Sequence, residues 1–93
     1  MPHFAIHCID KPESGDLRAA TRPAHLAHLD EVKGSVLAAG PLLSLEGAPM
    51  GSLLIIDFPD RKSAIDFAAR DPYAQAGLFA SVAVTAWRKV LPE

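Results

Sequence analysis

Four consecutive apolar residues, from Leu53 to Ile56, constrain the fold of this 93-residue chain more than any other feature. Side chains alternate between the two faces of a β-strand, so such a run predicts a strand that is apolar on both sides. The strand is expected to span residues 52–58. A cover is therefore needed for each face of the sheet that contains it.

The remaining elements are predicted from apolar periodicity and from the positions of Pro and Gly. Further strands are expected at residues 3–9, 35–43 and 81–90, and a turn or a short helix at residues 17–21. Pro23 at the first position and Gly34 as the stop predict a helix over residues 23–33. Asp60 is a good N-cap for a second helix over residues 61–70. The order β-α-β-β-α-β predicts a ferredoxin-like α+β fold, with one four-stranded antiparallel sheet and both helices on one face.

The second face of this sheet is expected to be apolar as well. The second strand runs Val36-Leu37-Ala38-Ala39, and the last strand alternates Val82, Val84 and Ala86 with Ala83, Thr85 and Trp87. An exposed apolar face of this size marks an interaction site. The simplest cover is the same face of a second copy, which predicts a homodimer with a barrel-like core, a dimeric α/β barrel. The alternative is a monomer that tolerates an apolar face.

Composition excludes several classes of protein. Lys and Arg number 9 and Asp and Glu number 11, so the net charge of −2 argues against a nucleic-acid partner. No apolar run approaches about 20 residues, so no membrane span is expected. Cys8 is the single cysteine, which rules out an internal disulfide. With no secretory signal pattern at its start, the chain is expected to be a single cytoplasmic domain over residues 1–93.

The segment Arg22-Pro23-Ala24-His25-Leu26-Ala27-His28-Leu29 carries the most chemical information. At about 3.6 residues per turn, His25 shares a helix stripe with Leu29 and Val32 and is expected to point inward. It is either a core histidine with satisfied nitrogens or a functional one. His25 and His28 could share a metal ion only with further ligands of clear identity. Since none is identified, no metal site is expected.

The segment Asp71-Pro72-Tyr73 offers a carboxylate for that imidazole. It is either a simple helix stop or a device in which Asp71 orients His25. A carboxylate bonded to one ring nitrogen fixes the tautomer, and the other nitrogen can then act as a general base. We therefore predict a hydrogen bond between Asp71 and His25, with the second nitrogen facing a pocket.

Other polar residues leave alternatives open. Asp10 is a second candidate carboxylate or a loop residue, and Arg22 either holds a substrate anion or contacts a helix end. His7 borders a pocket if its strand face lines the barrel, or else it is exposed at an edge. The candidate substrate-binding residues are Arg22, Asp10, His7, Ser52 and Tyr73.

With these residues the sequence resembles the YciI-like, or YCII-related, proteins of the dimeric α/β-barrel superfamily. The resemblance covers essentially the whole chain, and its matching segments are Asp10, residues 22–29, Ala39-Gly40-Pro41-Leu42, Gly51-Ser52-Leu53, Asp71-Pro72-Tyr73, Ala76-Gly77-Leu78 and the last strand. It implies a ferredoxin-like protomer, a homodimer and an active site built on a His–Asp pair, which maps to His25 and Asp71. The connection at residues 44–50 looks shorter than in some relatives, so the type of substrate is not implied.

Two functions are consistent with this resemblance. The first is an enzyme that uses the His25–Asp71 pair for isomerase- or lyase-type proton transfer on a small, in particular cyclic, molecule, without a metal or an organic cofactor. The alternative is a non-catalytic, dimeric module that binds a small ligand or serves as an accessory protein. A cofactor-free monooxygenase has less support, because such a pocket would be rich in aromatic groups and the chain has one Trp and one Tyr.

Overall fold

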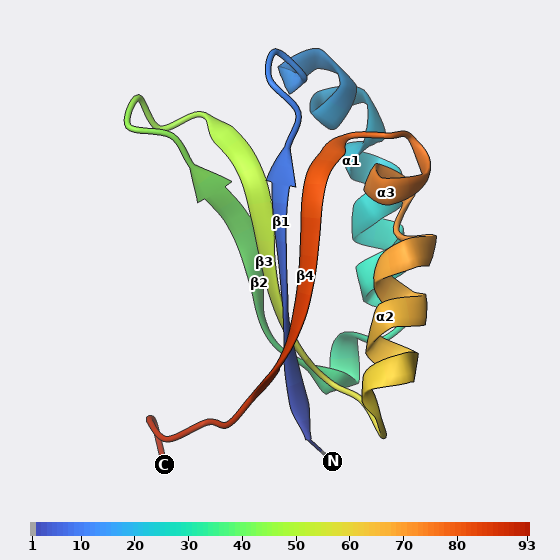
Figure 1. The fold of residues 1–93 in the computed structure, drawn as a ribbon, viewed down its shortest axis with the longest axis vertical. Helices are drawn as coiled ribbons and strands as arrows, with labels where there is room; N and C mark the ends of the chain where they lie inside the picture. The colour runs from blue at the N-terminus through green and yellow to red at the C-terminus, as the bar shows by residue number, and fades with distance from the viewer. Residues whose placement is uncertain (1) are drawn as a thin grey trace.

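The computed structural model describes residues 2–93 and shows a four-stranded antiparallel sheet with its helices on one face (Figure 1). The strands are β1 (His3–Asp10), β2 (Val36–Leu43), β3 (Pro49–Asp57) and β4 (Phe79–Trp87). The helices are α1 (Gly15–Asp30), α2 (Arg61–Arg70) and α3 (Pro72–Gln75), with a short 3₁₀ turn at Lys33–Ser35. The strand order is β2-β3-β1-β4. The ferredoxin-like α+β fold predicted from the sequence is confirmed.

The apolar run of β3 is explained by its central position. Leu54 and Ile56 are buried, and they pack with Phe4 and Ile6 of β1 and with Phe67 of α2 in the main core. The alternate residues of the run point to the opposite face of the sheet and are half-buried. One face of β3 is therefore covered by helices, and the other is covered only in part.

Helix α1 begins eight residues earlier than the sequence predicts, so the expected start at Pro23 is wrong. Pro23 lies inside the helix. A helical residue at this position would donate its N–H to the Ala19 carbonyl, and proline cannot. Both residues are exposed, so water can satisfy that carbonyl. Gly34 is also not the helix stop, because α1 ends at Asp30 and Gly34 lies in the 3₁₀ turn.

The other boundaries agree more closely. Helix α2 spans the predicted residues, and Asp60 caps it by accepting a hydrogen bond of 2.8 Å from the Ser63 N–H. Strand β3 begins three residues earlier than expected, and β4 spans residues 79–87 instead of 81–90. Residues 72–75, which directly follow the predicted helix stop, form the one-turn helix α3.

The side of the sheet away from the helices is called the open face here. Strand register places His3 opposite Trp87 and His7 opposite Ala83 on this face, whereas Val84 packs against the core. The predicted alternation of β4 is therefore confirmed. Within residues 2–93 no helix lies over the open face (Figure 1). None of the described helices is long and apolar enough to cross a membrane.

Candidate active site

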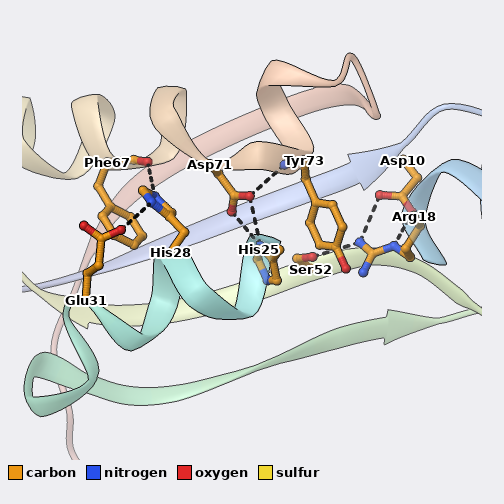
Figure 2. A network of polar contacts seen from close by, with 9 residues as sticks. All are labelled: Asp10, Arg18, His25, His28, Glu31, Ser52, Phe67, Asp71 and Tyr73. Carbon is orange, nitrogen blue, oxygen red and sulfur yellow. Dashed lines mark hydrogen bonds and ion pairs between the residues drawn. The ribbon is translucent and has the colours of Figure 1, made fainter. Parts of the chain in front are cut away.

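His25 and Asp71 meet where α1 passes the junction of α2 and α3 (Figure 2). The Nδ1 atom of His25 lies 2.9 Å from each carboxylate oxygen of Asp71. Both residues are buried, with 6% of His25 and 3% of Asp71 exposed. An ionised carboxylate beside Nδ1 can only accept a hydrogen bond, so it favours the tautomer in which Nδ1 carries the proton and Nε2 has a free lone pair.

The local sequence holds Asp71 in place for this contact. Pro72 disfavours helical geometry in the residue before it, and Asp71 leaves the helical region with ψ of 128°. The Asp71 carboxylate then caps α3, because its Oδ1 accepts a 2.9 Å hydrogen bond from the Tyr73 N–H. The carboxylate is thus fixed by its own turn as well as by His25.

Tyr73 lies between His25 and Arg18 (Figure 2). Its ring stacks on the His25 imidazole, with centroids 4.1 Å apart and an interplanar angle of 20°. The guanidinium carbon of Arg18 lies 4.5 Å from the centroid of the same ring, which is a cation–π contact. Burial raises the pKa of the Tyr73 hydroxyl, although the charge of Arg18 partly offsets this effect. The hydroxyl therefore stays neutral at physiological pH.

Arg18 forms a buried polar cluster with residues of β1 and β3. Its Nε donates to Asp10 Oδ2 at 2.6 Å, and its Nη2 donates to Asp10 Oδ1 at 3.1 Å and to Ser52 Oγ at 2.8 Å. Burial alone would lower the pKa of Arg18, but the hydrogen bonds and charge of Asp10 outweigh it and leave the pKa raised. Arg18 is thus a fixed positive charge, although only 7% of the residue is exposed.

A cavity of about 420 Å³ lies between α1 and the hairpin that joins β2 and β3. Its polar lining consists of Arg18, Arg22, His25, Ser52 and Tyr73. The rest is mainly apolar, with leucines of α1 on one side and alanines and prolines of the hairpin on the other. This volume is in the range of small-molecule sites, and an apolar lining with a few convergent polar groups is typical of them.

The structure brings most of the sequence-derived candidates together. Arg22, Ser52 and Tyr73 line the cavity beside His25, while Asp10 contacts it only through Arg18. His7 does not join them. It lies between two core residues of β1, so its side chain points to the open face, where it is exposed.

His28 lies outside the cavity although it is close to His25 in sequence. Its Nε2 lies 3.0 Å from the Phe67 carbonyl oxygen, and its ring stacks on the Phe67 ring with centroids 4.1 Å apart. It therefore joins α1 to α2. Within the described residues 2–93, no three His, Cys, Asp or Glu side chains are grouped as metal ligands would be.

Sequence reasoning missed Arg18. The pattern that could have found it is the spacing of Arg18, Arg22 and His25, which are four and three residues apart and so share one helix face. Cys8, which lies beneath this site in β1, is a core residue. Burial raises the pKa of its thiol to about 12, so the thiolate required of a nucleophile does not form at physiological pH.

Comparison with known proteins finds a matching family and relatives that align with almost the whole chain. The sequence model of the YCII-related domain matches residues 2–88. Protein YciI of Escherichia coli O6:H1 (strain CFT073) is 36% identical over 95 residues, covering 94% of this chain and 97% of the relative. An uncharacterised protein of Haemophilus influenzae is 34% identical over 96 residues, covering 95% of this chain and 98% of the relative.

Among solved structures, 5-chloro-2-hydroxyhydroquinone dehydrochlorinase (TftG) from Burkholderia phenoliruptrix AC1100 has a TM-score of 0.89 and 32% identity. The match covers 92% of this chain and 93% of that enzyme, which was solved in complex with 2,5-dihydroxybenzoquinone. An antibiotic biosynthesis monooxygenase has a TM-score of 0.58 at 16% identity and covers 97% of this chain and 99% of its own. The second likeness concerns the fold alone.

Proposed function

Since the chain belongs to the YCII-related family, we propose that it is a small-molecule enzyme in which His25 is the general acid–base and Asp71 its orienting partner. The reaction is a lyase-type elimination that needs neither a metal nor an organic cofactor. The observation that carries this proposal is the buried contact of Asp71 with Nδ1 of a histidine that lines the cavity. The contact leaves Nε2 as the nitrogen available to a ligand.

The proposed step is a proton transfer coupled to loss of a leaving group. His25 Nε2 takes a proton from the substrate, and the electron pair left behind forms a new double bond. The leaving group departs as an anion with the electron pair of its own bond, so the substrate loses one acid molecule, HX. The dehydrochlorinase, whose name describes a reaction of this class, supports the proposal through its 32% identity and TM-score of 0.89.

The cavity lining supports a small, flat substrate. Its apolar walls suit one ring, and Ser52 and Tyr73 contribute hydroxyl groups near His25. Arg22 lines the cavity and is proposed to attract a substrate anion at the mouth. Asp10 acts through Arg18, and His7 takes no part in substrate binding within a single chain.

We further propose that the protein is a homodimer of single domains, joined through the open face. Leu53 and Ile55 of the central strand β3 lie on this face and are half-buried in the single chain. Trp87 at its edge contacts His3 edge-on, with ring centroids 5.8 Å apart. A second copy would remove these apolar side chains from water, which is the main driving force of association.

The enzyme is tested with a matched pair of histidine variants. The wild-type protein, His25→Gln and His28→Gln are incubated with 5-chloro-2-hydroxyhydroquinone, and chloride release is followed. Loss of a general base lowers turnover by about 10²–10⁴-fold, so this loss is expected for His25→Gln only. His28→Gln can keep the hydrogen bond to the Phe67 carbonyl and serves as the control.

Two results would count against the proposal. Equal turnover by both variants would exclude His25 as the acid–base group. A wild-type protein that binds 2,5-dihydroxybenzoquinone but releases no chloride from the chlorinated compound would favour a non-catalytic ligand-binding module instead.

A further inference from the structure

The cavity has two polar ends, one formed by His25 and the other by Arg18. Tyr73 separates the two ends, since its ring contacts the His25 ring at 4.1 Å and the Arg18 guanidinium carbon at 4.5 Å. Because both groups contact one ring, they lie within about 9 Å of each other. A molecule with a single six-membered ring can therefore approach both from the cavity side.

The hydrogen bonds of Arg18 leave one of its nitrogens free of Asp10 and Ser52. A guanidinium carries five N–H groups, one on Nε and two on each terminal nitrogen. Asp10 and Ser52 accept from Nε and from Nη2 in three bonds, which account for all the N–H groups of these two nitrogens. Nη1 bonds to neither Asp10 nor Ser52. A side-chain hydrogen bond with Tyr73 also helps to raise the pKa of Arg18, and with that hydroxyl as a further partner at least one N–H of Nη1 remains for a ligand. Figure 2 shows the end of the Arg18 side chain turned toward the Tyr73 hydroxyl.

The charges around the cavity favour an anion. Arg18 and Arg22 both line it, and no Asp or Glu does so among the residues the structure describes. Arg22 makes no hydrogen bond or ion pair within residues 2–93. The carboxylate of Asp10 lies behind Arg18, where it fixes the guanidinium and keeps it charged. A carboxylate in that place makes Arg18 a rigid, preorganised donor.

We propose that Arg18 binds an oxyanion on the substrate, so that the cavity selects a six-membered ring with an ionised hydroxyl group, a phenolate or the enolate of a hydroxyquinone. The ionised oxygen accepts from Nη1 of Arg18, while another ring position faces Nε2 of His25. Asp10 and Ser52 are positioning residues that act through Arg18. The assignment rests on the proposed function for the reaction at His25, but the selectivity for anions does not require turnover.

The two ends would cooperate in the chemistry. When a base removes a proton from a hydroxylated ring, the electron pair is delocalised onto the ring oxygens. The bound ring already carries one negative charge on the oxygen beside Arg18, and the proton transfer adds further negative charge. A fixed positive charge at that oxygen stabilises the more negative transition state more than it stabilises the singly ionised ring. Arg18 would thus lower the barrier to the proton transfer that His25 carries out.

The test measures binding, using two ring compounds of similar size. 2,5-Dihydroxybenzoquinone is ionised near pH 7.5, and hydroquinone is neutral there. Calorimetric titration gives the ratio of their dissociation constants for the wild type and for the double variant Asp10→Asn/Arg18→Gln. Removing both charges avoids leaving Asp10 buried without a partner. The matched control, Lys62→Gln/Asp66→Asn, removes the exposed ion pair of α2, whose Nζ–Oδ2 distance is 3.0 Å.

The wild type and the control are expected to bind the ionised compound at least about tenfold more tightly than hydroquinone, as a charge-assisted hydrogen bond should allow. This preference is expected to disappear in the Asp10→Asn/Arg18→Gln variant, because the affinity for the ionised compound falls much more than the affinity for hydroquinone. A folded double variant that keeps the preference would overturn the proposal. If that variant does not fold, Asp10→Leu/Arg18→Met removes the same two charges with apolar side chains, and an unchanged preference there would also overturn the proposal.

The outcomes separate this inference from the proposed function. Anion selectivity without chloride release from any ring would leave Arg18 as the oxyanion site and reject the elimination reaction. Chloride release that depends on His25, with no selectivity that depends on Arg18, would support the elimination reaction and reject Arg18 as the oxyanion site.

Discussion

Asp71 makes two contacts that substitution can separate. One carboxylate oxygen caps α3 through the Tyr73 N–H, and both oxygens contact Nδ1 of His25. Asp71→Asn keeps a side-chain oxygen for the cap, and Asn is as good an N-cap as Asp. Its amide NH₂ group, however, can donate to an unprotonated Nδ1, which would move the imidazole proton to Nε2. Asp71→Ala removes both contacts.

The expected losses follow from these contacts. Asp71→Asn replaces a charge-assisted hydrogen bond with a neutral one and should lower the free energy of unfolding by about 1 kcal/mol. Asp71→Ala loses the cap, about 1 kcal/mol, and leaves a buried imidazole N–H without a partner, about 1–3 kcal/mol. Its total loss is about 2–4 kcal/mol. Turnover is expected to fall about 10³–10⁴-fold in Asp71→Asn, the effect of placing a catalytic imidazole in the wrong tautomer.

Two measurements check these values. Urea denaturation at one fixed protein concentration gives the free energies of unfolding for the wild type and both variants. Nitrogen-15 NMR of the His25 ring reports which nitrogen carries the proton, and needs no substrate. The wild type is expected to carry it on Nδ1, and Asp71→Asn to shift it toward Nε2.

The reasoning would be refuted by a wild-type imidazole that is neutral with its proton on Nε2. It would also be refuted if Asp71→Asn kept full turnover, because the charge and the tautomer would then be irrelevant to the reaction. Equal stability of the Asn and Ala variants would show that the cap of α3 contributes nothing.

Four further predictions follow from the fold. Sedimentation equilibrium at micromolar concentration should give about twice the chain mass of 9.9 kDa, whereas a clean monomer would reject the open face as an interface. Trp87→Ala should weaken that dimer by about 2–4 kcal/mol, the range for truncating a buried aromatic anchor, and an unchanged dissociation constant would place Trp87 outside the interface. Gly51→Ala should destabilise the protein by about 2 kcal/mol in urea denaturation, because a Cβ would collide with the Cys8 carbonyl oxygen and displace β3; an unchanged midpoint would contradict this. Cys8, with a pKa of about 12, should react with a thiol reagent at pH 8 only after unfolding, and rapid labelling of the native protein would show that the thiol is accessible.

Local sequence predicts the elements of this fold where one signal dominates. The bounds of α2 are correct because Asp60 caps its start and Pro72 forces the chain out of the helix at Asp71. The predicted start of α1 is wrong because Pro23 is typical of a first helical turn, whereas the helix already begins at Gly15 and Pro23 lies inside it. The helix that continues through Pro23 buries Arg18 and His25 and packs Leu29 against the core, and no local rule includes such tertiary contacts.

The same error hid part of the site. A turn or a separate short helix at residues 17–21 does not place Arg18 on the helix face that carries His25, whereas the continuous helix α1 does. The pairing of His25 with Asp71 connects residues 46 positions apart, so residue types and a family resemblance predict it, whereas spacing along the chain does not. The contact of Arg18 with Ser52 of β3 depends on how α1 lies across the sheet, which only the assembled fold determines.

The hairpin between β2 and β3 has a consequence for how such a protein can diversify. Ala48 and Pro49 line the cavity, yet the loop of residues 44–48 is largely exposed. Each doubling of a flexible loop costs only about 0.6 kcal/mol in closure entropy, so insertions there are thermodynamically tolerable. They would reshape the cavity mouth without moving His25 or Asp71. Changes in this hairpin could thus alter which ligand the cavity admits while the proposed proton-transfer pair is inherited unchanged.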